Sequence, residues 1–145
     1  MAMKFQYEEL IQKAIKAPSG HNTQPWKFRI GDNTITIYPD YERALPVVDA
    51  DNHALFISLG CALENLIIAA EHYGFNTSIK INTEQVNKES ITVQLIPSAP
   101  KEDVLLYNFI DVRQATRNIY NSKPIPVCDI EKLKAASLQK DVQTV

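Results

Sequence analysis

The sequence predicts an α+β protein in which antiparallel β-hairpins pack on a long central helix. Strand-like segments alternate apolar with polar residues and arrive in adjacent pairs, at 26–38 and 75–97, and not as βαβ units. A helical segment with a continuous apolar stripe, 52–73, lies between the two pairs. At 145 residues, of which 45% are hydrophobic, the chain is long enough to bury one domain core.

The first segment, 5–16, is predicted to form an amphipathic helix. Its apolar residues recur at three- and four-residue spacing: Tyr7, Leu10, Ile11, Ala14 and Ile15. Pro18 ends this helix, because proline lacks a backbone N–H and disfavours helical geometry in the residue before it. In the polar turn that follows, Gly20 can take a positive φ, while Ser19 and Asn22 can bond nearby backbone groups or a ligand.

Each predicted hairpin has two strands that alternate in polarity. In the first hairpin, strands 26–30 and 34–38 flank a Gly-Asp-Asn turn. In the second, strands 75–82 and 90–97 flank a polar stretch. Between the first hairpin and the central helix, residues 39–48 contain two prolines and no clean period, so they predict a connecting loop.

The central helix is predicted to run from about Asn52 to Tyr73. Asp51 is its expected N-cap, and Gly74 is a typical C′ residue just beyond its end. We expect the helix to be central and largely buried, with one continuous apolar stripe in the core: Leu55, Leu59, Leu63, Leu66 and Ala70.

A second side of this helix is polar. Ser58, Asn65 and His72 recur every seven residues and therefore share a face, which we expect to be partly solvated. A ligand-lining face or a dimer contact is the alternative. A membrane span is rejected, because polar residues interrupt the apolar run well short of the roughly 20 apolar residues that a bilayer needs: His53, Glu64, Asn65, Glu71 and His72.

Composition and charge argue against several classes of function. The chain has 15 Lys and Arg residues against 17 Asp and Glu, so it has no net positive charge that would attract nucleic acid. Cys61 and Cys128 form no CxxC pair and the three histidines show no ligand spacing, so neither a disulfide framework nor a metal site is predicted. The N-terminus lacks a signal-peptide pattern, and we expect a cytoplasmic protein. No GxGxxG, P-loop or GxSxG motif occurs.

The turn between the first helix and the first hairpin carries the most specific pattern in the chain. Residues 17–26 read Ala-Pro-Ser-Gly-His-Asn-Thr-Gln-Pro-Trp, which resembles the A-P-S-x-x-N-x-Q-P-W signature of the nitroreductase family of flavin mononucleotide (FMN) enzymes. The Gly-His form resembles the Acg-like branch, whose members are long chains made of two nitroreductase-like halves. The resemblance implies that residues of this turn lie beside the flavin ring: Pro18, Ser19, Gly20, Asn22 and Gln24.

A second fragment of the family pattern lies near the C-terminus. Arg113-Gln114-Ala115-Thr116-Arg117, followed by Pro-Ile-Pro and a predicted helix, resembles the opening of a nitroreductase unit. The resemblance implies that Arg113 and Arg117 bind the FMN phosphate, although Ala115 replaces a hydroxyl residue usual in the family. We therefore expect residues 1–97 to form a first nitroreductase-like unit, and 98–145 to be a linker and the opening of a second, with helices predicted at 103–111 and 129–138.

The resemblance implies an FMN-dependent NAD(P)H oxidoreductase that reduces nitroaromatics, quinones or similar electrophiles. Because each flavin site in the family is built between two units, it also implies a homodimer. No side chain is expected to be catalytic, since the flavin ring carries the electron chemistry and the protein supplies binding, orientation and electrostatics. The alternative is a truncated, non-catalytic flavin- or ligand-binding module, because fold membership does not confer activity.

Overall fold

The computed structural model describes residues 2–84, 88–101 and 104–136, and it divides into two compact units, Met1–Ala115 and Thr116–Val145. The first unit contains the helices α1 (Ala2–Ala14), α2 (His53–His72) and α3 (Tyr107–Ile110), the short 3₁₀ helices η1 (Gly20–Asn22) and η2 (Tyr41–Arg43), and the strands β1 (Trp26–Gly31), β2 (Thr34–Pro39), β3 (Phe75–Asn82) and β4 (Ser90–Pro97). The second unit contains α4 (Val127–Ala136).

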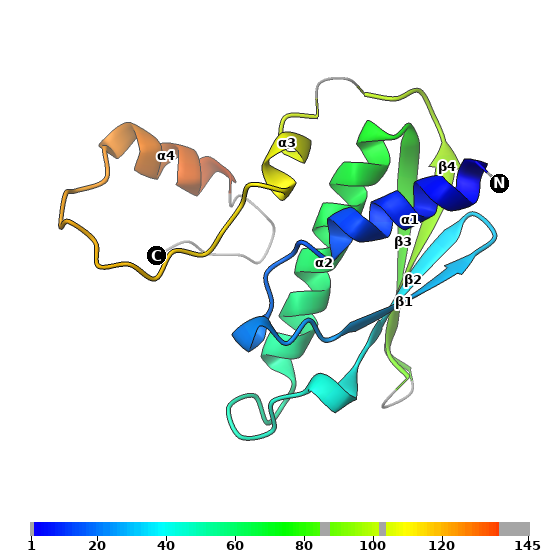
Figure 1. The fold of residues 1–145 in the computed structure, drawn as a ribbon, viewed down its shortest axis with the longest axis horizontal. Helices are drawn as coiled ribbons and strands as arrows, with labels where there is room; N and C mark the ends of the chain where they lie inside the picture. The colour runs from blue at the N-terminus through cyan, green and yellow to red at the C-terminus, as the bar shows by residue number, and fades with distance from the viewer. Residues whose placement is uncertain (1, 85–87, 102–103, 137–145) are drawn as a thin grey trace. The chain divides into compact units, whose positions relative to one another are not determined.

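The four strands form one antiparallel sheet in the order β1-β2-β4-β3 (Figure 1). The two predicted hairpins, β1–β2 and β3–β4, are confirmed. They join through β2 and β4, where Ile35 pairs with Val93 and Ile37 with Ile91. Side chains alternate between the two faces along each strand, so this register places the apolar residues of both central strands on the same face.

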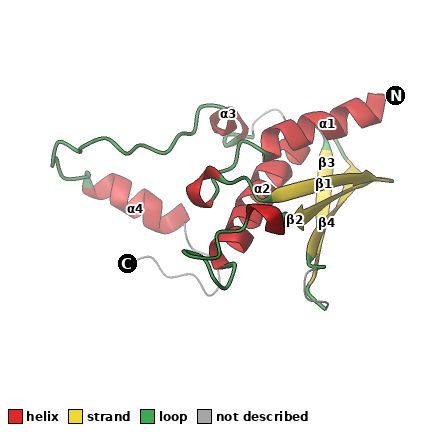
Figure 2. Ribbon diagram, turned by 60° about the horizontal axis from the view of Figure 1, so that its bottom comes forward, coloured by secondary structure: helices red, strands yellow, loops and turns green. Residues whose placement is uncertain are grey.

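Helices α1 and α2 cover one face of the sheet (Figure 2), and the core lies in this layer. Its main cluster joins Tyr7, Leu10 and Ala14 of α1 to Leu66, Ala69 and Ala70 of α2 and to sheet residues such as Ile35 and Val93. A second cluster surrounds Trp26, Ile37 and Leu59. These contacts confirm the predicted α+β class with antiparallel hairpins packed on a long helix.

The N-terminus of α2 is capped differently from the prediction. Asp51 accepts a hydrogen bond from the N–H of His53, at 3.3 Å. The buried carboxylate of Asp49 accepts the N–H groups of Ala54 and Leu55, both at 2.9 Å, and so satisfies donors that the first turn leaves free. The chain reverses at Asn52, whose φ of 59° is left-handed, and this reversal directs Asp49 toward the helix end.

The apolar stripe of α2 is narrower than predicted. Leu55, Leu59, Leu66 and Ala70 are buried, whereas Leu63 is half-buried and packs at the edge of the core. Within the described part of the chain, α2 is the one helix that is long and apolar enough to cross a membrane, judged by its length and composition. The prediction that polar residues leave its apolar run too short for a membrane span does not agree with this criterion. Core helices pass the same test, and one face of α2 packs on the sheet.

The polar side of α2 is partly solvated, as predicted, at Asn65 and His72, which are half-buried, whereas Ser58 is buried. The Ser58 hydroxyl is buried against the turn after α1, and the Asn65 amide donates to the carbonyl oxygen of Lys13 at 3.3 Å. The His72 ring stacks on Tyr107, with 3.7 Å between ring centroids. Three segments distant in sequence therefore lie along this face: the turn, the end of α1, and α3.

The segment after the sheet is less helical than predicted. Of the predicted helix 103–111, the structure forms only the short α3, with residues 102–103 outside the described part. An ion pair between Lys13 and Asp111 holds this segment on α1. In the second unit, α4 begins two residues before the predicted start at 129, and the predicted end at 138 lies outside the described residues.

Candidate functional site

The turn after α1 contains three residues with left-handed backbone in four positions. The φ angles are 49° at His21, 58° at Asn22 and 51° at Gln24. Gly20 does not use its freedom to take a positive φ, because it begins η1 and the left-handed backbone starts one residue later. Asparagine tolerates this region best among these residues, whereas histidine and glutamine enter it at a greater cost.

Hydrogen bonds inside the turn hold this conformation. The Ser19 hydroxyl accepts the N–H of Gln24 at 2.9 Å, which closes the turn across its strained residues. The N–H of Asn22 donates to the carbonyl oxygen of Ser19, and that of Thr23 to the carbonyl oxygen of Gly20, both at 3.0 Å. The Thr23 hydroxyl also donates to Gly20. The backbone of the turn is thus largely satisfied from within.

Two residues outside the turn also hold it. The Gly20 N–H donates to the hydroxyl of Ser58 on α2 at 3.2 Å, and that hydroxyl donates to the carbonyl oxygen of Ala54 at 2.7 Å. From the other direction, the Arg43 guanidinium donates to the carbonyl oxygen of Thr23 at 3.1 Å. Sequence reasoning assigned neither residue to the site; the available signals were the seven-residue polar spacing on α2 and the Arg-Ala-Leu-Pro-Val-Val-Asp segment, which resembles the Acg-like pattern.

The five predicted ring-side residues lie together in this turn. Pro18, Asn22 and Gln24 are exposed, and Ser19 and Gly20 are half-buried. Within the described residues, the side-chain amides of Asn22 and Gln24 have no hydrogen-bond partner, so both can donate and accept toward a ligand. The structure therefore presents two free amides on a fixed backbone, with a hydroxyl at the start of the same turn.

A buried carboxylate organises the charges beside the turn. The Asp40 carboxylate forms an ion pair with Lys27 at 2.8 Å and another with Arg43 at 3.4 Å. The Lys27 contact is the main cause that lowers the pKa of Asp40 from its usual value, and burial opposes it. Asp40 therefore stays ionised near neutral pH and anchors the guanidinium that contacts Thr23.

The two predicted phosphate-binding arginines belong to different compact units. Arg113 lies near the end of the first unit. Its guanidinium donates to the carbonyl oxygen of Lys16, just beyond the end of α1, at 3.1 Å. Arg117 lies in the second unit and is exposed. Residues 113–117 are not helical, so the helical spacing that would place both arginines on one face does not apply. Their role toward phosphate stays a prediction.

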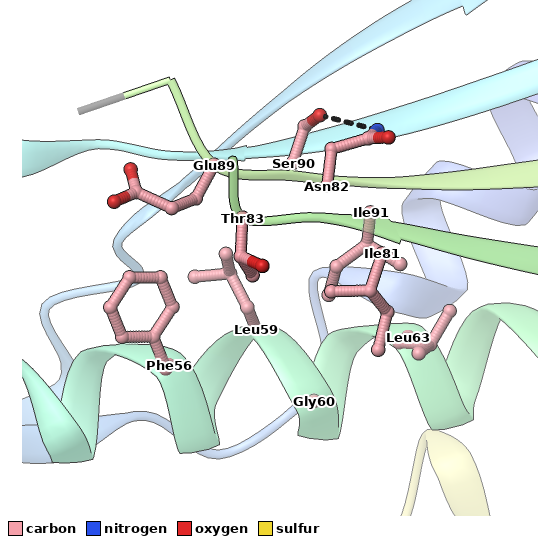
Figure 3. Close-up of a pocket in the computed structure, with 10 residues that line it drawn as sticks. All are labelled: Phe56, Leu59, Gly60, Leu63, Ile81, Asn82, Thr83, Glu89, Ser90 and Ile91. Carbon is pink, nitrogen blue, oxygen red and sulfur yellow. Dashed lines mark hydrogen bonds between the residues drawn. The ribbon is translucent and has the colours of Figure 1, made fainter. Parts of the chain in front are cut away.

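An apolar groove of about 350 Å³ lies on another side of α2 (Figure 3). Phe56, Leu59 and Leu63 of α2 face the end of the β3–β4 hairpin, including Ile81. Near its rim, the Tyr41 hydroxyl donates to Glu89 at 2.6 Å. Burial, followed by this hydrogen bond, raises the pKa of Tyr41 to about 12. Sequence reasoning did not identify this groove.

Comparison with solved structures defines the class of fold. A protein of Parabacteroides distasonis, described as a "Putative NADH dehydrogenase/NAD(P)H nitroreductase", aligns with a TM-score of 0.54 and 17% identity over 68% of this chain and 77% of its own. A "Putative NADH Oxidase" of Clostridium acetobutylicum gives 0.53 and 17%, over 68% of this chain and 78% of its own. The fold is that of the nitroreductases.

Sequence relatives narrow this class. The chain is 28% identical over 135 residues to the "Putative NAD(P)H nitroreductase Rv3131" of Mycobacterium tuberculosis, and 29% identical over 70 residues to the "Putative NAD(P)H nitroreductase acg" of the same species. No profile of an established sequence family matches. These relatives confirm the predicted resemblance to the nitroreductase family and its Acg-like branch. The chain spans 39% of the length of the first relative and 21% of the second.

Proposed function

We propose that the protein is an FMN-dependent NAD(P)H oxidoreductase of the nitroreductase type, which reduces nitroaromatics, quinones or similar electrophiles. The observation that carries this proposal is the turn 17–26, which presents the Asn22 and Gln24 amides on a backbone fixed by hydrogen bonds. The names of the relatives support NAD(P)H as the electron donor.

The residues of the turn fit the edge of a flavin ring. A flavin ring carries carbonyl oxygens that accept hydrogen bonds and an N–H that donates one, and an amide can satisfy either group. Asn22 and Gln24 supply such amides, and Ser19 can still donate its hydroxyl hydrogen while it accepts from Gln24. Arg117 would supply a guanidinium for the phosphate, with Arg113 as the second candidate. Bound FMN would supply the electron-transfer chemistry, which none of these side chains provides.

Flavin binding is tested first by the visible absorption spectrum of the purified chain, and then by oxidation of NADH and NADPH after FMN is added. A flavin spectrum together with NAD(P)H oxidation supports the oxidoreductase. A flavin spectrum without NAD(P)H oxidation favours the second candidate, a non-catalytic flavin-binding module. This candidate is kept because membership of a fold does not confer activity.

Mutants separate the predicted ring contacts from the predicted phosphate contacts. Loss of one charge-assisted contact costs about 1.5–3 kcal/mol, so Arg117→Ala is expected to weaken FMN binding roughly ten- to a hundredfold while riboflavin, which lacks the phosphate, binds as before. Asn22→Ala should weaken both ligands alike. Titration of the flavin absorbance or fluorescence measures each dissociation constant.

The matched control is Arg29→Ala, which removes an exposed arginine from β1. It should leave the affinities for both flavins unchanged. Arg113→Ala is less specific, because it also removes the hydrogen bond to Lys16 beyond α1. If Arg117→Ala weakens FMN and riboflavin equally, the phosphate role of Arg117 is wrong.

We propose further that the flavin-competent form is a homodimer in which Ser19 and Asn22 face the partner's site. Exposed apolar side chains on α2 support such an association: Ile57 is 55% exposed, and Phe56, which lines the apolar groove, is 40% exposed. An exposed apolar patch commonly marks an interaction site.

Ile57→Asp should convert a dimer into a monomer, because a charge would be buried at the contact, while the free chain tolerates it at a side chain that is 55% exposed. Size-exclusion chromatography with light scattering measures the mass, and circular dichroism checks the fold. Val47→Asp, at an exposed loop position, is the control and should leave the mass unchanged. A flavin-loaded monomer of the unmutated chain would contradict the dimer proposal.

A further inference from the structure

We infer that Ser58 and Arg43 are positioning residues that hold the turn 17–26 in its ligand-presenting conformation from two sides. The expected effect of these residues on flavin binding rests on the proposed function. Their expected effect on the flavin-free chain rests only on the geometry of the turn. Neither side chain belongs to the turn: Ser58 lies 38 residues from Gly20, and Arg43 lies 20 residues from Thr23.

The turn needs external support because its conformation is costly. Left-handed backbone in a residue other than glycine costs on the order of 1–2 kcal/mol, and here it occurs at His21, Asn22 and Gln24. Such strain persists only where the surrounding structure determines the conformation more strongly than the local sequence does. The bond from Gln24 to Ser19 is internal and does not fix the turn relative to the rest of the fold.

Ser58 supplies a rigid attachment. Its side chain is 2% exposed, and its hydroxyl donates to the carbonyl oxygen of Ala54 one helical turn earlier. The hydroxyl hydrogen is therefore directed along the helix, which leaves the oxygen lone pairs free to accept the Gly20 N–H. Gly20 begins η1, so this bond fixes the point at which the strained residues start. Gly20 is half-buried, so solvent replaces this bond only in part when the Ser58 hydroxyl is removed.

Arg43 supplies the second attachment, at the far end of η1. Its guanidinium donates to the carbonyl oxygen of Thr23 and is itself held by the Asp40 carboxylate. The exposed residues His21 and Asn22 lie between the positions held by Ser58 and by Arg43. The two contacts together restrain both ends of the segment that presents the Asn22 amide.

Amide hydrogen exchange, measured by NMR on the flavin-free chain, tests the inference directly. Ser58→Ala should accelerate exchange at the Gly20 and Gln24 amides by roughly two- to tenfold, the factor for one lost hydrogen bond. The matched control is Ser90→Ala, which removes another buried serine hydroxyl, bonded to Asn82 and not to the turn. The control should leave the Gly20 and Gln24 amides unchanged. Unchanged exchange at both amides in Ser58→Ala would overturn the inference.

Arg43→Met provides a second variant that keeps an unbranched side chain and removes the donor to Thr23. It should accelerate exchange at Gln24, where the turn closes on Ser19. An unchanged Gln24 amide would overturn the role of Arg43.

Flavin titration then tests the consequence. Each variant should weaken FMN and riboflavin by a similar factor, roughly two- to tenfold, because the turn faces the ring and not the phosphate. A loss confined to FMN would contradict the positioning role. If the unmutated chain binds neither flavin, the proposed function fails, and the exchange measurements still decide whether Ser58 and Arg43 hold the turn.

Discussion

Replacing Leu66 by alanine is expected to lower the free energy of unfolding by about 2–5 kcal/mol. Leu66 is 0% exposed on α2, where it belongs to the cluster that joins α1, α2 and the sheet. Truncation removes buried apolar surface and leaves a cavity that helices on one side and strands on the other cannot easily fill. Because a domain's whole stability is typically about 5–15 kcal/mol, denaturant unfolding should show a large fall in the midpoint.

Two leucines make this experiment specific. Leu63→Ala should cost less than Leu66→Ala, because Leu63 is only half-buried at the edge of the core. Leu105→Ala, at a side chain that is 67% exposed, should change the stability by no more than about 0.5 kcal/mol. Equal losses at all three positions would contradict the burial order on which the prediction depends.

The hairpins could be predicted closely from the sequence because strand periodicity is local. Alternating residues at 75–82 and 90–97 define strands whose observed bounds match the prediction. What the pattern could not predict is the joining of the hairpins. The pairing of β2 with β4 connects segments separated by the whole of α2, and it depends on the apolar faces of both hairpins being covered by the same helices.

The faces of α2 show a second limit of periodicity. Seven-residue spacing correctly places Ser58, Asn65 and His72 on one side, but it carries no information about what lies against that side. The covering groups come from elsewhere in the chain, as in the stacking of Tyr107 on His72. The N-terminus of the helix shows the same limit, because the capping carboxylate of Asp49 reaches it only after a reversal at Asn52.

The candidate site was predicted through its signature, and its supports were not. The resemblance identifies a contiguous run of residues, and contiguity ensures that Ser19, Asn22 and Gln24 lie together. Ser58 and Arg43 contact that run through its backbone, at the N–H of Gly20 and the carbonyl oxygen of Thr23. A contact to the backbone of the turn does not depend on which side chain the contacted residue carries. The residues of the signature therefore gave no indication that Ser58 and Arg43 contact it.

Gly74 connects the end of α2 to β3 in a conformation that the sequence did predict. Its φ is +83°, a region that residues with a side chain rarely adopt. The carbonyl oxygen of Gly74 accepts the N–H of Ser98 at 2.7 Å, so the segment after β4 packs directly on the end of the helix. A Cβ at Gly74 would lie 2.9 Å from the carbonyl oxygen of Ser98 and 3.0 Å from the backbone nitrogen of Pro100.

Gly74→Ala is therefore expected to destabilise the first unit by roughly 2–5 kcal/mol, as the sum of left-handed strain in a residue with a side chain and overlap with backbone that cannot move aside. Denaturant unfolding measures the loss. Gly60→Ala is the matched control, because its Cβ would meet nothing within 4 Å and alanine favours a helix by up to about 1 kcal/mol over glycine. The control should leave the unit as stable or more stable. If Gly74→Ala and Gly60→Ala have the same free energy of unfolding, the backbone at Gly74 is not left-handed in solution. The packing of Ser98 and Pro100 on α2 is then looser than the structure shows.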